Sequence, residues 1–165
     1  MRLSPRTLRF ALNLWPPFLG AGIRVRSISP DWRCVRVELR HGRINTGFFG
    51  THFGGSLYAM TDPFPALQLV HLLGPDYVVW DRSARIDYLK PGRGRVHAET
   101  RVPEGEVARL KAAAASGAKQ LPEYEVTIQD ETGEVVARVH RTVYVRLRRD
   151  RRPAPSAPPS PRGNP

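Results

Sequence analysis

The sequence has 165 residues and a formal net charge of +11 at neutral pH, and 41% of its residues are hydrophobic. This length suits one compact domain with a real core and leaves little chain for a second domain. The single cysteine, Cys34, excludes an intramolecular disulfide, and no run approaches the roughly 18 apolar residues of a membrane span, so we expect a cytoplasmic protein.

The positive charge is almost entirely arginine, since only three of the 26 basic residues are lysines. Such charge suits a nucleic acid, an anionic lipid or a phosphorylated ligand. It also follows from an Arg-, Ala-, Gly- and Pro-rich composition with the arginines on solvated strand faces. The sequence lacks the aromatic-plus-basic signature of the common RNA-binding sheets, so we do not expect a nucleic acid partner.

The chain begins with a predicted helix over Pro5–Leu14, with Ser4 as N-cap and Pro5 at the first helical position. Two strands are predicted next, over residues 22–28 and 32–40. Apolar and charged residues alternate in the second of them, which is typical of a strand with one buried face.

The most apolar helix is predicted over residues 54–73, "GGSLYAMTDPFPALQLVHLL", and ends at Gly74 and Pro75. Asp62 lies in the middle of this helix, immediately before Pro63. A carboxylate and a helix breaker at that point need an explanation.

The remaining pattern predicts strands over 77–90 and 95–102, a short helix over 104–115, and a hairpin over 124–147 with its turn at 130–133. Half-buried strands need an apolar element to cover, and the 54–73 helix is the only candidate of sufficient length. We therefore predict one α+β domain, residues 1–148, in which a curved antiparallel sheet surrounds that helix. Residues 149–165, rich in Pro, Ser and Arg, form a predicted disordered tail.

Three motifs carry a family resemblance: "HFGGSLYAMTD" at 52–62, "ARIDYLKPGRGRVHAETRV" at 84–102 and "GEVVARVHRTVYVR" at 133–146. They resemble the start of the central helix, the strand-turn-strand signature and the closing hairpin of PaaI-like thioesterases. The chain is therefore similar to the hotdog-fold thioesterase superfamily, closest to its bacterial members of unknown function. The resemblance implies a hotdog fold with one long central helix, an acyl thioester substrate, and active sites at the interface of a homodimer or a dimer of dimers.

Asp62 has two interpretations. An aspartate before proline is a good helix N-cap, so Asp62 could simply end one helix and begin the next. In the resembled family, an acidic residue lies eight positions after the first glycine of the pair, as Asp62 does after Gly54. Asp62 is then the base or nucleophile, and the free amides of Gly54 and Gly55 stabilise the oxyanion.

The spacing of these groups predicts an oligomer. Eight residues at about 1.5 Å per residue place Asp62 about 12 Å along the helix axis from Gly54. One helix therefore cannot bring both residues to one carbonyl, whereas two antiparallel copies can.

The remaining candidates come from the same resemblance, and each also has a plain structural interpretation. His52, Asn45, Asp81 and Ser83 are candidate substrate-binding residues, although Phe53 separates His52 from the glycine pair and Asn45 lies two positions further upstream than the family pattern. Lys90, Arg93 and Arg95 are candidates for the phosphates of coenzyme A. We expect no metal and no cofactor other than the coenzyme A of the substrate, because no histidines show metal-ligand spacing.

These observations predict an acyl-CoA thioesterase-like hydrolase. Two alternatives remain open: a non-catalytic hotdog domain that binds an acyl ligand, and a basic interaction module that uses the arginine surface and the tail.

Overall fold

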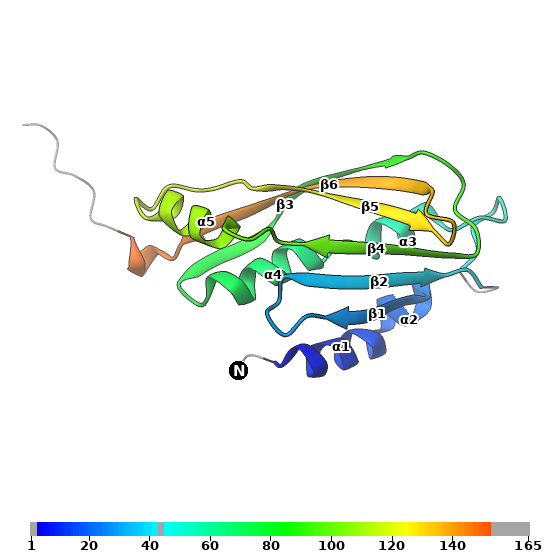
Figure 1. The fold of residues 1–165 in the computed structure, drawn as a ribbon, viewed down its shortest axis with the longest axis horizontal. Coiled ribbons are helices and arrows are strands. Elements are labelled where there is room, and N and C mark those ends of the chain that lie inside the picture. Colours follow the sequence, from blue (N-terminus) through cyan, green and yellow to red (C-terminus); the bar gives the residue numbers. More distant parts are fainter. Residues whose placement is uncertain (1–2, 43–44, 153–165) are drawn as a thin grey trace, which may run out of the picture.

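A computed structural model describes residues 3–42 and 45–152 of the chain, and these residues form one antiparallel sheet with helices on its inner face and at one edge (Figure 1). The strands are β1 (Ile23–Ile28), β2 (Cys34–Arg40), β3 (Tyr77–Tyr88), β4 (Arg95–Arg101), β5 (Glu123–Asp130) and β6 (Val135–Leu147). The helices are α1 (Pro5–Leu14), α2 (Pro16–Ala21), α3 (Gly54–Ala59), α4 (Phe64–Leu73) and α5 (Glu106–Ala114), followed by the 3-10 turn η1 (Arg149–Arg151).

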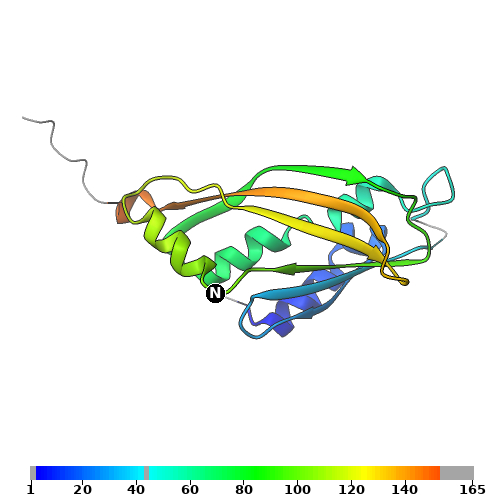
Figure 2. The same cartoon turned by 45° about the horizontal axis from the view of Figure 1, so that its top comes forward.

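The six strands lie in the order β1-β2-β4-β5-β6-β3, and every neighbouring pair is antiparallel. The sheet curves around α3 and α4, as the two views of the ribbon show (Figures 1 and 2). The predicted α+β class and the curved antiparallel sheet around a central helical segment are confirmed.

The inner face of the sheet is built by the alternation that the sequence predicted. Val35, Val37 and Leu39 of β2 are buried, while the residues between them are not. They pack in one core cluster with Leu57 of α3 and Phe64 of α4, both at most 3% exposed. Burial of these side chains against the central helices is the main stabilising contribution that the strands make.

The central helical segment differs from the single helix predicted over 54–73, because it is divided into α3 and α4 by a turn at residues 60–63. The Asp62 N–H closes the last turn of α3 on the carbonyl of Ala59 (3.2 Å). Pro63 has no N–H to continue the ladder, so the helix ends and restarts. The Pro63 carbonyl then accepts from Leu67 in the first turn of α4.

One helix ends and the next begins around Asp62, as one interpretation predicted, but the side chain of Asp62 does not cap α4. The N-cap of α4 is Pro63, and no side chain bonds to the first turn of α4. The carboxylate of Asp62 is used elsewhere.

The helix α1 begins as predicted, with the hydroxyl of Ser4 accepting from the Thr7 N–H (3.2 Å). It lies along the outer edge of β1, where the amide of Asn13 accepts from the Val25 N–H (2.8 Å) and donates to the Val25 carbonyl (3.0 Å). These bonds occupy backbone groups that an edge strand otherwise exposes.

The opposite edge of the sheet is the 12-residue strand β3, which pairs with β6 on one side only. Within residues 3–42 and 45–152, no strand pairs with its other side. One edge of the sheet is therefore protected, and the other presents unpaired backbone groups.

The disordered tail was predicted to begin at residue 149, but its first residues form a short helical turn. Arg149–Arg151 forms η1, and Arg151 Nε lies 3.4 Å from a carboxylate oxygen of Asp76. The rest of the predicted tail, residues 153–165, lies outside the described residues. No helix in the described part of the chain is both long enough and apolar enough to cross a membrane.

Candidate functional site

The carboxylate of Asp62 is held by a buried arginine on the neighbouring sheet. Arg141 lies on the inner face of β6, with a side chain only 1% exposed, and its Nη1 donates to Asp62 Oδ1 at 2.9 Å. The Asp62 side chain itself is 53% exposed. The turn between α3 and α4 therefore presents an anchored carboxylate that solvent can reach.

The guanidinium of Arg141 is fixed by further contacts with the same segment. Its Nη2 donates to the carbonyl of Tyr58 and to the hydroxyl of Thr61, both at 3.2 Å. Its Cζ lies 4.7 Å from the centroid of the Tyr58 ring, a cation–π distance. The α3–α4 turn and the centre of the sheet are thus joined through one side chain.

A second carboxylate lies close to the same guanidinium. Asp81 of β3 places Oδ1 4.0 Å from Arg141 Nη1. Burial raises the pKa of Asp81; the charge of Arg141 opposes this effect and the charge of Asp62 adds to it. Two acidic groups in different environments therefore flank one buried cation.

Sequence reasoning missed Arg141, although the alternation contained a signal for it. The inner-face positions of β6 run through Val139, position 141 and Val143, and an arginine interrupts this apolar series. A charged residue on a buried strand face needs a buried partner. The interrupted alternation could therefore have identified Arg141, although not its partner.

Gly54 and Gly55 at the start of α3 belong to a second group of candidate residues, apart from Asp62 and Arg141. The helix-start N–H groups of Gly54 and Gly55 make no backbone hydrogen bond within the described residues, since the first bonded amides of α3 are those of Ser56 and Leu57. The hydroxyl of Tyr88 lies so close to Gly54 that a Cβ there would be 2.8 Å from it. A side chain at position 54 would displace the exposed Tyr88 ring.

A shallow pocket of about 430 Å³ opens beside this glycine pair. Of the predicted site residues, Gly54, His52 and Lys90 contribute to its lining, together with Tyr88 and the apolar Leu57. Asp62 does not line it. Within one chain, the structure therefore places Asp62 and Asp81 beside Arg141, and His52 and Lys90 beside Gly54.

His52 supports the turn that closes this pocket. Its Nε2 bonds to the carbonyl of Gly94 (3.0 Å), and its backbone N–H donates to the carbonyl of Gly92 (2.9 Å). Burial lowers the pKa of His52, which favours the neutral form of the ring. These bonds place the ring against the Pro91–Gly94 turn.

The amide of Asn45 is engaged by backbone. Its Nδ2 donates to the carbonyls of Ala21 (2.7 Å) and Arg40 (2.6 Å), and its Oδ1 accepts from the Gly42 N–H (2.7 Å). These contacts tie the loop after β2 to the end of α2. Ser83, by contrast, is exposed on β3 opposite Thr142.

The three predicted phosphate-binding cations are not equivalent. Lys90 pairs with Asp130 (2.6 Å) and with Glu134, so its charge is compensated by the β5–β6 turn. Arg95 has one distant carboxylate partner, with Nε 3.9 Å from an oxygen of Glu131. Arg93 is exposed, and its bond within the described residues is to the carbonyl of Gly50. Arg93 is therefore the best placed of the three to meet an anion.

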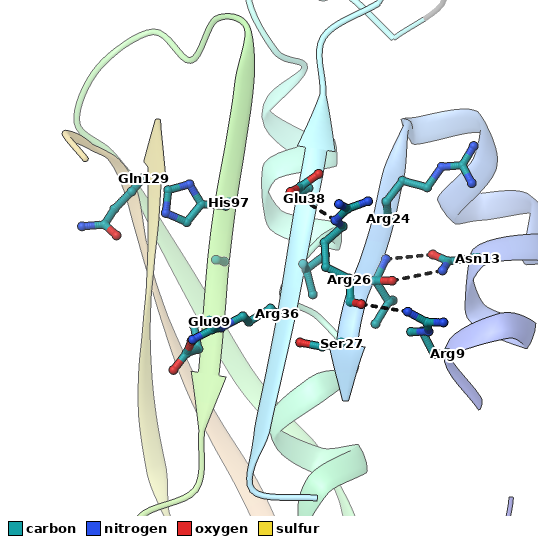
Figure 3. Close-up of a pocket in the computed structure, with 13 residues that line it drawn as sticks. Arg9, Asn13, Arg24, Arg26, Ser27, Arg36, Glu38, His97, Glu99 and Gln129 are labelled. Carbon is teal, nitrogen blue, oxygen red and sulfur yellow. Dashed lines mark hydrogen bonds and ion pairs between the residues drawn. The ribbon is translucent and has the colours of Figure 1, made fainter. Parts of the chain in front are cut away.

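A groove of about 980 Å³ lies on the outer face of the sheet beside α1 (Figure 3). Its charges are largely paired with one another: Arg36 lies 2.6 Å from Glu99, and Arg26 lies 3.3 Å from Glu38. Its lining includes Ser27 and His97, but no hydrogen bond joins these two side chains among the described residues. We therefore do not assign it a catalytic role.

Glu99 makes this outer face sensitive to acid. Hydrogen bonds from Arg36 and Arg101 lower the pKa of Glu99 from 4.5 to about 2. A carboxyl with a lowered folded-state pKa stabilises the protein above its unfolded pKa, and this stabilisation is lost as the pH falls from about 4.5 toward 2.

We therefore expect Glu99→Gln to lower the free energy of unfolding at pH 7, with the difference from the wild type disappearing near pH 2. Denaturant unfolding at several pH values measures this, with Glu104→Gln on an exposed loop as control. A difference that does not change between pH 7 and pH 3 would contradict the role of the ion pairs.

Comparison with known proteins identifies the family. A family model described as a domain of unknown function, DUF4442, matches residues 5–145, so the chain belongs to this family. A search of curated proteins found none that matches the sequence.

Solved structures show the fold. A Pseudomonas aeruginosa protein of unknown function, described as a probable thioesterase, superposes with a TM-score of 0.76 at 22% identity over 90% of this chain and 99% of its own. A Haemophilus influenzae thioesterase gives 0.65 at 15% identity, over 89% and 93% of the two chains. The PaaI protein of the phenylacetic acid degradation operon of E. coli gives 0.59 at 17% identity, over 86% and 91%. The chain has the hotdog fold of these structures, as the sequence motifs predicted.

Proposed function

We propose that this protein is a hydrolase of acyl thioesters, most simply of acyl-CoA. The observation that carries the proposal is the Asp62 carboxylate, held at the break in the central helix by Arg141 and half exposed to solvent. The fold supports it, because structures with the same fold are described as thioesterases. The hotdog fold alone would not suffice, since one fold hosts many functions.

The proposed chemistry uses Asp62 and the start of α3. Asp62 accepts a proton from water as the water attacks the thioester carbonyl, or it attacks that carbon directly to form an anhydride that water then hydrolyses. In both routes the C–S bond breaks, the thiolate of coenzyme A leaves, and a carboxylic acid is released. The amides of Gly54 and Gly55 donate to the oxygen on which negative charge develops.

The proposed site is composite. The pocket beside Gly54 does not include Asp62 of the same chain, which lies beyond the end of α3 at Ala59. A second copy paired through the open edge of β3 supplies the missing group, and symmetric pairing then forms two equivalent sites. The closed β1 edge directs pairing to β3.

The test is release of free thiol from a panel of short, long and aryl acyl-CoA esters. The proposal expects turnover of at least one ester. Saturable binding without any thiol release would instead indicate the non-catalytic acyl-binding domain. Absence of both, with strongly salt-dependent binding to an anionic polymer, would indicate the basic interaction module.

Sedimentation gives a separate prediction. We expect a dimer, or a dimer of dimers, at micromolar concentration, because a single chain does not complete the site. Analytical ultracentrifugation over a range of concentrations measures this. A folded monomer throughout that range would contradict the composite site.

A further inference from the structure

We propose that Arg141 is the positioning residue of the reaction, which fixes the Asp62 carboxylate for its attack or proton transfer. This inference rests on the proposed function of Asp62. It adds a residue on β6 that the motifs did not identify.

The geometry allows Arg141 to orient Asp62. A guanidinium is a planar, rigid donor, so fixing its plane also fixes the direction of each N–H. The plane is fixed here by the Tyr58 carbonyl, the Thr61 hydroxyl and the Tyr58 ring. The remaining Nη1 is then directed at Asp62 Oδ1. The Asp62 carboxylate lies in a turn and is half exposed, so few neighbouring atoms limit the rotation of its side chain. The hydrogen bond from Arg141 restricts this rotation.

Stability is a weak explanation for an arginine at this position. Position 141 lies between the buried valines Val139 and Val143, in a core where an apolar side chain would also pack. Its Nε is buried with no hydrogen-bond partner among the described residues, which costs free energy. An arginine that contacts a solvent-accessible carboxylate is better explained by its effect on that carboxylate.

The Asp62–Arg141 pair defines a double-mutant cycle. Arg141→Met replaces the guanidinium with an apolar side chain of comparable length, Asp62→Asn removes the carboxylate, and the double variant combines them. Arg141→Lys keeps the charge but loses the planar fork. Arg138→Met, at an exposed position of the same strand, is the matched control.

We expect Arg141→Met to lower kcat by about a hundredfold, the scale of a misplacement by about 1 Å, with KM changed much less. Arg141→Lys should recover part of that loss, and Arg138→Met should retain wild-type kcat. The double variant should be no slower than Asp62→Asn alone, because a positioning residue acts only through the group it positions. A melting curve for each variant separates misfolding from loss of turnover. If Arg141→Met does not fold, Arg141→Lys replaces it in the double-mutant cycle.

The outcomes separate the two claims. If Asp62→Asn keeps wild-type turnover, or the wild type has none, the proposed function fails and the inference about Arg141 falls with it. If Asp62→Asn is inactive while a folded Arg141→Met keeps wild-type kcat, only the inference is overturned. Losses that multiply in the double variant would also overturn it, because Arg141 would then act independently of Asp62.

Discussion

Asp62→Asn is expected to lower the turnover of acyl thioesters by at least about a hundredfold, the lower range for loss of a general base. The change removes the negative charge but keeps the shape of the side chain and an oxygen that can accept the hydrogen bond from Arg141. The melting temperature should therefore change little, since the Asp62 side chain is half exposed and caps no helix.

The matched control is Asp76→Asn. Asp76 is also a surface carboxylate paired with an arginine, Arg151, but it lies in the turn after α4. Thiol release and thermal unfolding are measured for both variants under the same conditions. Equal turnover of wild type and Asp62→Asn would show that the Asp62–Arg141 pair is structural and that another group performs the chemistry.

Much of the architecture could be predicted because it depends on local periodicity. Alternation in β2 placed Val35, Val37 and Leu39 on one face, and the structure buries all three. The start of α1 followed from Ser4 and Pro5, whose capping chemistry is local. The wrapping of the sheet followed from the need of these strands for one apolar element.

The division of the central helix could be anticipated only in part. Pro63 indicated a local disturbance, but the amphipathic and apolar pattern on both sides of it predicted one continuous helix over residues 54–73. The structure shows that the missing N–H of Pro63 outweighs this pattern, and α4 begins afresh at Phe64.

The partners of charged side chains could not be predicted, because they depend on which strands become neighbours. Lys90 was a candidate for binding a phosphate of coenzyme A. In the fold it forms an ion pair with Asp130, 40 positions away in the sequence. Arg141 and Asp62 are 79 positions apart and meet only because the sheet curves over the α3–α4 turn. Such contacts between residues far apart in the chain cannot be inferred from a single sequence.

The largest loss of stability is expected from Phe64→Ala. Phe64 is the first residue of α4, fully buried, with its ring centroid 6.2 Å from that of Phe18. Truncation removes the buried ring and leaves a cavity, at a cost of about 3–5 kcal/mol in the free energy of unfolding. For a domain of this size, each kcal/mol lowers the melting temperature by about 2–4 °C, so a decrease of about 10 °C is expected.

Thermal unfolding at a fixed protein concentration measures this decrease, because association would otherwise shift the transition. Phe10→Ala is the matched control, since Phe10 lies exposed on α1, at the sheet edge opposite β3, and should change the free energy of unfolding by no more than about 0.5 kcal/mol. Phe64 follows Asp62 and Pro63 directly, so the cavity also loosens the turn that holds the carboxylate. Turnover of Phe64→Ala should therefore fall even at temperatures where the variant is folded, whereas Phe10→Ala should keep wild-type turnover. A melting temperature of Phe64→Ala within about 2 °C of the wild type would contradict the packing of Phe64 in the core.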